Sequence, residues 1–221
     1  MTAKDLINYT IPPLKLTDDV EKALIWMQEF HVHELPVIDD GKFLGLFNEN
    51  LLFDIVEDTK VVGDIQLVST HLAVHQDEHY YEVLKKAYEA SSTLVAVLNN
   101  EDTYIGAVTI QDVVEAFSKM SSIHSPGTIL VLTLSAHDYS MTEIGKIVES
   151  EGSKILSSFT ENIDNEPDKI RLTLKLNTNN VNSVVSSFER YGHSITSIFG
   201  QEDESNIEKE RLDTLMKYLS V

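Results

Sequence analysis

The sequence predicts a mixed α+β protein in which a strand, helix, strand, strand, helix unit occurs twice. A separate domain of order β-α-β-β-α-β and a C-terminal helix follow it. Three observations lead to this prediction. A hairpin followed by a helix recurs about sixty residues apart, a Ser-rich stretch with Pro-Gly follows the second copy, and a different alternation of apolar residues begins after it.

The repeat is organised around residues 104–112, an apolar strand that runs through a small polar turn into a helix. Gly106 permits close approach to the backbone, Thr109 is suited to cap the helix, and Asp112 follows one turn later on the same side. A carboxylate there can accept the 2′ and 3′ hydroxyls of a ribose, and the first-turn amides can hold a polar or anionic group. The alternative is an ordinary N-cap with an acidic first turn.

The upstream copy has the same order of elements. An Asp-Gly pair joins its two strands, which is a strong hairpin signal, and a one-sided apolar stripe marks the helix that precedes each hairpin. The expected elements of the first copy are an extended piece at 13–16, a helix at 20–30, strands within 35–48 and a helix from about Glu49. Those of the second copy are an extended piece at 71–74, a helix at 80–90, strands at 95–98 and 103–109, and a helix at 110–118. A short lead helix is expected at 2–8, and Thr17 or Asp18 is expected to cap the helix at 20–30.

On these residues the chain resembles a CBS-domain pair, also called a Bateman module. The mark of that family is Gly, two apolar residues, Thr or Ser, two further residues and Asp, and the second copy keeps it as Gly106, Thr109 and Asp112. The first copy keeps the preceding His-Glu-Leu-Pro-Val-Ile-Asp at 33–39 and Gly45, but has Asn48 in place of Thr and Leu51 in place of Asp, unless a one-residue gap brings Asn50 to that position. The resemblance implies CBS domains at 1–62 and 63–122.

The resemblance also implies which residues hold a ligand. It implies an adenosyl-type site at the second motif, formed by Gly106, Thr109 and Asp112. His33 matches the family's histidine, and Thr70 stands where the family's second motif often lines the adenine pocket.

Composition sets outer limits on the class of protein. The chain has 221 residues, 42% of them apolar, a net charge of −19 and no cysteine. A core of ordinary size is expected, and disulfides and thiolate chemistry are excluded. The strong negative charge argues against nucleic acid or an anionic membrane as the main partner. Neither a signal-peptide core nor an apolar run long enough to span a membrane is found, so we expect a cytoplasmic protein.

The distribution of charge bears on the ligand. Residues 1–126 contain 8 Lys, no Arg and 21 Asp or Glu. Arginine is the usual partner of phosphate, and related CBS modules that hold nucleotide phosphates often have Arg where this chain has Glu34. We therefore expect AMP, adenosine or a compound of the S-adenosylmethionine class, or a metal-bridged nucleotide, rather than free ATP.

Histidine spacing raises a metal hypothesis. His71, His75 and His79 are four residues apart, which on one helix would align ligands for zinc or nickel. The repeat instead places the first two on an extended segment, where residues four apart are about 13 Å from each other. We therefore predict no metal site.

A linker is predicted at 123–127, within the Ser-rich stretch 121–127. The pattern after it predicts a domain at 128–200 with the order β-α-β-β-α-β of a ferredoxin-like fold. Its expected elements are strands at 128–134, 155–159, 170–176 and 194–199, helices at 139–151 and 181–191, and a polar turn at 162–168.

This second domain resembles an ACT domain. ACT domains usually pair through their sheets and bind an amino acid between the first strand and the first helix. The resemblance implies Asp138 as a ligand contact, whereas Met141 stands where a glycine is usual and would block approach to the backbone. Structural dimerisation and amino-acid binding both remain open.

Residues 201–221 are predicted to form a charged C-terminal helix with an apolar stripe. The order CBS, CBS, ACT is similar to small proteins of the acetoin-utilisation-B type, which implies a regulatory and non-catalytic role. We find no catalytic triad or P-loop in the sequence. The expected partners are a small-molecule effector, a second copy of the chain and an unknown regulated protein. The alternatives are an acidic dimeric scaffold without a small-molecule ligand, or an amino-acid sensor that acts through the ACT domain.

Overall fold

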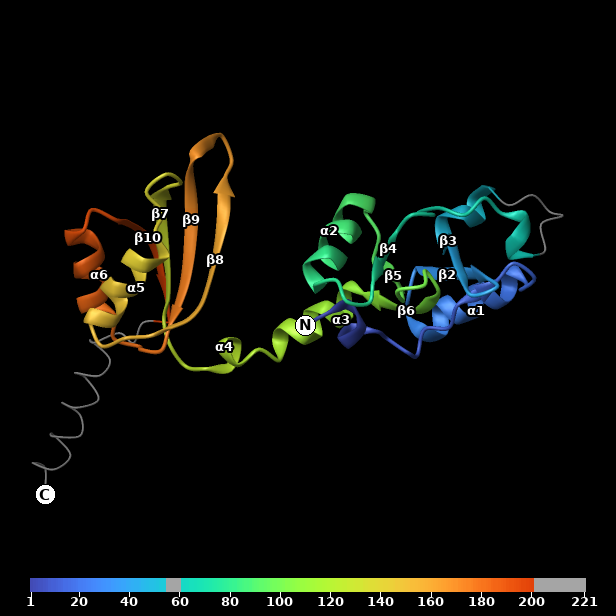
Figure 1. Ribbon diagram of the computed structural model, residues 1–221, viewed down its shortest axis with the longest axis horizontal. Helices are drawn as coiled ribbons and strands as arrows, with labels where there is room; N and C mark the ends of the chain where they lie inside the picture. The colour runs from blue at the N-terminus through green and yellow to red at the C-terminus, as the bar shows by residue number, and fades with distance from the viewer. Residues whose placement is uncertain (55–60, 201–221) are drawn as a thin grey trace, which may run out of the picture. The chain divides into compact units, whose positions relative to one another are not determined.

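The computed structural model describes residues 1–54 and 61–200 (Figure 1). The chain divides into two compact units, Met1–Lys119 and Met120–Val221. The predicted C-terminal helix at 201–221 lies outside the described residues, as do residues 55–60 after the first hairpin.

The first unit contains the predicted repeat. Each copy forms its own three-stranded sheet, in which a short strand pairs in parallel with the first strand of an antiparallel hairpin. The elements of the first copy are η1 (Ala3–Leu6), β1 (Leu14–Lys15), α1 (Val20–Phe30), β2 (Glu34–Asp39), β3 (Lys42–Asn48) and η2 (Glu49–Asp54). Those of the second copy are η3 (Val62–Asp64), β4 (Ala73–His75), α2 (Tyr80–Ala90), β5 (Leu94–Leu98), β6 (Tyr104–Thr109) and α3 (Ile110–Ser118).

The helices α1 and α2 occupy the predicted residues. Each buries a stripe at helical spacing, Val20, Ala23 and Met27 in α1 and the corresponding positions in α2. Each ends at a residue in the left-handed conformation, His31 and Ser91, with φ of 54° and 50°. The N-cap of α1 is Asp19, one residue beyond the predicted Asp18, because the Asp18 carboxylate instead accepts hydrogen bonds from Lys15 and Lys22.

The two hairpins turn as their residues require. Asp40 and Gly41 have φ of 44° and 79°, the positive values that a two-residue turn between strands needs. In the longer second turn, the side-chain oxygen of Asn99 accepts hydrogen bonds from the backbone N–H groups of Glu101 and Thr103, both at 2.9 Å.

The two copies exchange their leading segments. The backbone of Asn8, before β1, donates to Ala107 of the second copy at 2.8 Å, and Leu46 of the first copy pairs with Val68, before β4. Ile7 consequently covers Gly106, where any Cβ would collide with the Ile7 side chain. The leading segment of each copy therefore pairs with the last strand of the other copy's sheet.

Two local expectations differ from the structure. The element after the first hairpin is a 3-10 helix through Asp54 rather than an α-helix, and the lead helix at 2–8 is a single 3-10 turn over Ala3–Leu6. Residues Ser121–His124 form the helix α4, so the first two residues of the predicted linker at 123–127 are helical.

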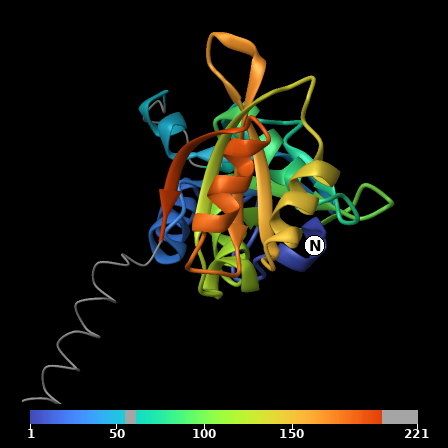
Figure 2. The ribbon, with the colours of Figure 1, turned by 90° about the vertical axis from the view of Figure 1, so that its left-hand side faces the viewer.

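The second unit has the predicted order of elements. They are β7 (Ile129–Ser135), α5 (Met141–Ser150), β8 (Ile155–Ile163), β9 (Glu166–Leu176), α6 (Asn182–Arg190) and β10 (Ser194–Phe199). The sheet is antiparallel with strand order β10-β7-β9-β8, and α5 and α6 lie side by side over one face of it (Figure 2). Buried residues of the sheet and of both helices form one core, which includes Leu132, Leu174, Ile144 and Phe188.

The hairpin of β8 and β9 is longer than expected. Residues 162–168 were expected to be a turn, but the strands continue to Ile163 and restart at Glu166, with Asn165 at a φ of 64° in the turn between them. β7 pairs with β9 only as far as Lys169, so the tip of the hairpin extends past the rest of the sheet, as Figure 1 shows.

Candidate functional site

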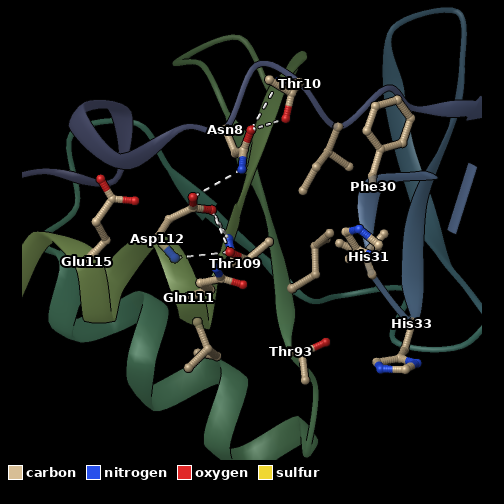
Figure 3. A pocket seen from close by; sticks show the side chains of 14 residues that line it. Asn8, Thr10, Phe30, His31, His33, Thr93, Thr109, Gln111, Asp112 and Glu115 are labelled. Carbon is tan, nitrogen blue, oxygen red and sulfur yellow. Dashed lines mark hydrogen bonds between the residues drawn. The ribbon is translucent and has the colours of Figure 1, made fainter. Parts of the chain in front are cut away.

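A pocket of about 460 Å³ lies where α3 begins (Figure 3). Four segments line it: the leading segment before β1, the end of α1 with the start of β2, the start of β5, and the junction of β6 with α3. The lining residues are 8, 10, 11, 30–33, 93, 94, 109–112 and 115. The leading segment that carries Asn8 and Thr10 belongs to the first copy, and the exchange brings it to the Thr109 and Asp112 motif of the second copy.

Thr109 and Asp112 form a capping box at the start of α3. The Asp112 Oδ2 atom accepts hydrogen bonds from the Thr109 backbone N–H at 2.8 Å and from the Thr109 hydroxyl at 2.6 Å, and the Asp112 N–H donates back to Thr109 Oγ1 at 3.1 Å. This reciprocal arrangement satisfies two backbone donors that a helix start leaves free. It also fixes the carboxylate on the wall of the pocket, so the predicted pair Thr109 and Asp112 is together in the structure.

Asn8 is a pocket residue that the sequence analysis missed. Its side-chain Nδ2 donates to Asp112 Oδ1 at 3.1 Å, and its Oδ1 accepts from the Thr10 N–H at 3.1 Å and the Thr10 hydroxyl at 2.6 Å (Figure 3). The contact joins residues 104 positions apart in the chain. The only sequence signal for it is that Thr10 stands sixty residues before Thr70, at the same place in the repeat.

The charged side chains of the pocket are acidic. Asp112 and the exposed Glu115 line it, and no Lys or Arg belongs to the lining residues that the structure describes. Lys119, one turn after Glu115, forms a hydrogen-bonded ion pair with it at 2.5 Å, which holds the pKa of the Glu115 carboxyl below its ordinary value. The described lining residues therefore offer a ligand two carboxylates, and no lysine or arginine that could pair with a phosphate.

The other predicted site residues lie in different places. His33 lines the pocket, and its Nδ1 is 2.9 Å from Glu49 Oε1. Gly106 does not line the pocket, since Ile7 occupies the space in front of it. Thr70 is exposed and does not line the pocket either; its Cγ2 lies beside Gly45 of the first copy. The exchange of leading segments explains the difference, because it brings Thr10 to the second motif and takes Thr70 to the first.

A buried carboxylate lies beside the corresponding motif of the first copy. Glu34 is 5% exposed, and its Oε2 accepts from the Ser92 hydroxyl at 2.6 Å, the Thr93 N–H at 2.9 Å and the Thr93 hydroxyl at 3.2 Å. Its Oε1 accepts from Asn48 Nδ2 at 3.0 Å. Glu34 thus joins the two copies. It also occupies the position at which, by the family resemblance, an arginine would favour binding of a nucleotide phosphate.

The residues proposed for an amino-acid site in the second unit lie at the start of α5. Asp138 is exposed, and its backbone N–H closes a turn onto Ser135 at 3.2 Å. Met141 is the first residue of α5 and is 38% exposed, while Ser140 before it caps the helix. The side chain of Met141 therefore does not fill the core.

Two of the three spaced histidines have local structural roles. His75 Nδ1 lies 3.2 Å from the Asn99 carbonyl oxygen, and the His79 ring accepts from the Tyr81 N–H at the start of α2. Within residues 1–54 and 61–200, no three His, Asp or Glu side chains gather as a metal ion would require. In the same described ranges, no helix has the length and apolar character needed to cross a membrane.

Comparison with known proteins places the repeat in a family. Residues 62–119 match the family model of the CBS domain. The described part of residues 1–54 repeats the order of elements found in this matched segment.

Several solved structures are similar over about half of the chain. One is a CBS domain pair/ACT domain protein from Thermotoga maritima, with 25% identity over 53% of this chain and 96% of that chain and a TM-score of 0.47. A second, CBSX2 in complex with AMP, has 24% identity over 52% and 95% of the two chains and a TM-score of 0.46. A third is a CBS domain pair in complex with 5′-methylthioadenosine and S-adenosyl-L-methionine, with 20% identity over 53% and 96% and a TM-score of 0.43.

Proposed function

We propose that this protein is a non-catalytic regulator whose first unit binds an adenosyl-type ligand, such as adenosine, AMP or S-adenosylmethionine, in the pocket at α3. The observation that carries the proposal is the position of the Asp112 carboxylate. It is fixed by the capping box on the wall of a pocket of about 460 Å³. Pockets for small molecules generally measure about 300–1,000 Å³, so the volume suits a nucleoside.

Hydroxyl groups are the ligand groups that this wall is suited to hold. An ionised carboxylate only accepts hydrogen bonds, and hydrogen bonds to a charged acceptor are stronger than those between neutral groups. Asp112 Oδ2 is occupied by Thr109, and Oδ1 has one protein donor, Asn8. The sugar hydroxyls of an adenosyl group therefore have a charged acceptor at Oδ1.

The charge of the pocket ranks the ligands within this class. Each phosphate would add negative charge beside Asp112 and Glu115, without a lysine or arginine among the described lining residues to offset it. A neutral or cationic adenosyl compound is therefore preferred over a free nucleoside triphosphate. A metal ion carried by the nucleotide itself would reduce the difference.

The second unit is proposed to be an ACT-like domain at residues 128–200. Its support is the order β-α-β-β-α-β, the antiparallel sheet β10-β7-β9-β8 and the two helices over one face, which is the arrangement of ferredoxin-like domains. In this proposal, binding at the first unit alters pairing between two copies of the chain, and the regulated protein responds to that change.

The test is calorimetric titration with adenosine, AMP, ATP with and without magnesium, and S-adenosylmethionine. The variant is Asp112→Asn, in which the remaining carbonyl oxygen can still serve Thr109 while the amide places a donor where Oδ1 accepts. We expect it to weaken binding by about 10- to 100-fold, the loss that follows from removing a charged acceptor.

The matched control is Asp5→Asn. Asp5 forms the same kind of capping box with Thr2, accepting from its N–H at 2.8 Å and its hydroxyl at 3.1 Å, but does not line this pocket. Unchanged affinity in Asp5→Asn and a loss in Asp112→Asn support the proposal. Equal affinities in all three proteins would remove Asp112 from the site.

A further inference from the structure

The side chain of Asn8 occupies an acceptor that the proposed ligand needs. Asp112 has about four acceptor positions on its two oxygens. Thr109 uses two of them, on Oδ2, and Asn8 Nδ2 uses one on Oδ1. One position is therefore free, whereas a ligand with two neighbouring hydroxyls presents two donors.

The orientation of the Asn8 amide is fixed by its other contacts. Its Oδ1 accepts from both the N–H and the hydroxyl of Thr10, at 3.1 Å and 2.6 Å. A flipped amide would place its oxygen against the Asp112 carboxylate and its NH₂ against the Thr10 N–H. The NH₂ group is consequently directed at Asp112, as Figure 3 shows.

The other repeat shows that the fold does not need this amide. Val68 occupies the position that corresponds to Asn8, and its backbone exchanges hydrogen bonds with Leu46 at 2.8 Å and 3.1 Å. Leu51 occupies the position that corresponds to Asp112. An apolar residue therefore serves the backbone pairing equally well, and the amide occurs in the copy that has the carboxylate.

We infer that Asn8 is a specificity-determining residue that competes with the ligand for Asp112. A ligand with a single hydroxyl uses the free position on Oδ1 and leaves Asn8 in place. A vicinal diol gains its second hydrogen bond only by displacing the Asn8 amide, so Asn8 reduces the advantage of a ribose over a deoxyribose. This inference rests on the proposed function and adds to it the residue that sets the selectivity of the pocket.

The test compares adenosine, 2′-deoxyadenosine and 3′-deoxyadenosine as titrants of the wild type, Asn8→Ala and Asn8→Val. Removing the competitor should strengthen adenosine binding about tenfold, the value of a net hydrogen bond to a charged group. Binding of each deoxyadenosine should change less than about threefold. Asn8→Val introduces the residue that the other repeat carries, so the two variants separate loss of the amide from loss of side-chain volume.

The control is Asn99→Ala. Asn99 also orders backbone N–H groups through its side-chain oxygen, but it lies in the second hairpin and does not line the pocket. Its selectivity for ribose should equal that of the wild type. Circular dichroism at the titration temperature identifies any variant that has unfolded.

A selective gain for adenosine in both Asn8 variants supports the inference. Weaker adenosine binding would mean that Asn8 holds the ligand instead of competing with it, and an unchanged ratio between adenosine and the deoxyadenosines would mean that it does neither. Either result overturns the inference and leaves the proposed function standing. If the wild type and both variants bind none of the three compounds nor the other adenosyl compounds, the proposed function fails, and the inference with it.

Discussion

Replacing Glu34 tests whether its buried carboxylate holds the two CBS repeats together. The side chain is 5% exposed and accepts four hydrogen bonds, three of them from Ser92 and Thr93 of the second repeat. Glu34→Leu introduces the residue type found at the corresponding position, Leu94, and leaves the Thr93 N–H and the Asn48 amide without their acceptor. The Ser92 hydroxyl also donates to the Leu94 carbonyl at 2.9 Å, so it keeps one partner.

The expected costs follow from these contacts. Thr93 is exposed and Asn48 is half-buried, so water can replace part of the lost bonding, and each donor left without its acceptor costs an amount near the lower end of about 1–3 kcal/mol; such costs are not additive within one network. We expect Glu34→Leu to reduce the free energy of unfolding by about 2–3 kcal/mol. Glu34→Gln keeps one oxygen for Ser92 and Thr93 but opposes its NH₂ to the NH₂ of Asn48, so we expect a loss of about 1–3 kcal/mol.

The assay is urea unfolding followed by tryptophan fluorescence. Trp26 is the single tryptophan of the chain and lies in α1, so the signal reports on the first unit. Glu49→Gln is the matched control, because the Glu49 side chain is 49% exposed and contacts His33 alone among the ion pairs described. It should cost less than about 0.5 kcal/mol. If Glu34→Gln costs no more than Glu49→Gln, the carboxylate does not join the repeats as argued.

Three further predictions concern packing, pH and ligand charge. Gly106→Ala should destabilise the first unit by about 1–3 kcal/mol, because the new Cβ collides with Ile7. The control is Gly145→Ala in α5, whose Cβ meets no atom within 4 Å and which should stabilise the helix by up to about 1 kcal/mol. Thermal unfolding of the two variants and the wild type measures both effects. Burial raises the pKa of the Asp18 carboxyl, but hydrogen bonds from Lys22 and the backbone outweigh it and hold the pKa below its ordinary value of 3.8. Asp18→Asn should therefore lower the free energy of unfolding at about pH 7, and this loss should vanish as the pH falls through the folded-state pKa of Asp18. A loss of the same size at every pH would contradict this linkage. Affinity should fall from adenosine to AMP to ATP without magnesium, as measured by titration, and an increase along this series would show that the pocket has a phosphate-binding group.

The elements that the sequence predicted best are those with a regular apolar pattern. α1 and α2 have the predicted bounds because each has a one-sided apolar stripe, α3 has them because Thr109 and Asp112 mark its start, and β10 likewise has the predicted residues. The extension of β8 and β9 was missed because residues 161–168 are polar except for Ile163 and Pro167, and they extend past the strand β7. Without burial on one face, the sequence of a strand does not alternate.

The helix after the first hairpin was mispredicted for a reason that the second copy makes clear. Thr109 and Asp112 begin α3 with a reciprocal capping box. In the first copy, Asn48 accepts from the Asn50 N–H at 2.8 Å and donates to Glu34, and Leu51 offers no acceptor for a backbone N–H. The chain therefore enters a 3-10 helix there.

The pocket itself was only half predicted, because local patterns do not reveal which repeat supplies each wall. Thr109 and Asp112 are adjacent in sequence and were found from their spacing. Asn8 and Thr10 reach the same pocket through the pairing of Asn8 with Ala107, about a hundred residues away. Thr70 was assigned to the site only from the family resemblance, and the structure places its side chain beside Gly45 of the first copy.

The residues of the two motifs predict one ligand per chain. At the first motif, the Asn48 amide already donates to Glu34, and Leu51 provides no acceptor for a hydroxyl. At the second motif, the corresponding residues are Thr109 and Asp112, and buried Leu94 replaces the carboxylate of Glu34. The two motifs thus differ both in the acceptor they offer to a hydroxyl and in the helix that follows them, a 3-10 helix in the first copy and an α-helix in the second. Titration with adenosine should saturate at one equivalent per chain; a second equivalent that survives Asp112→Asn would show that the first motif also binds, despite Glu34.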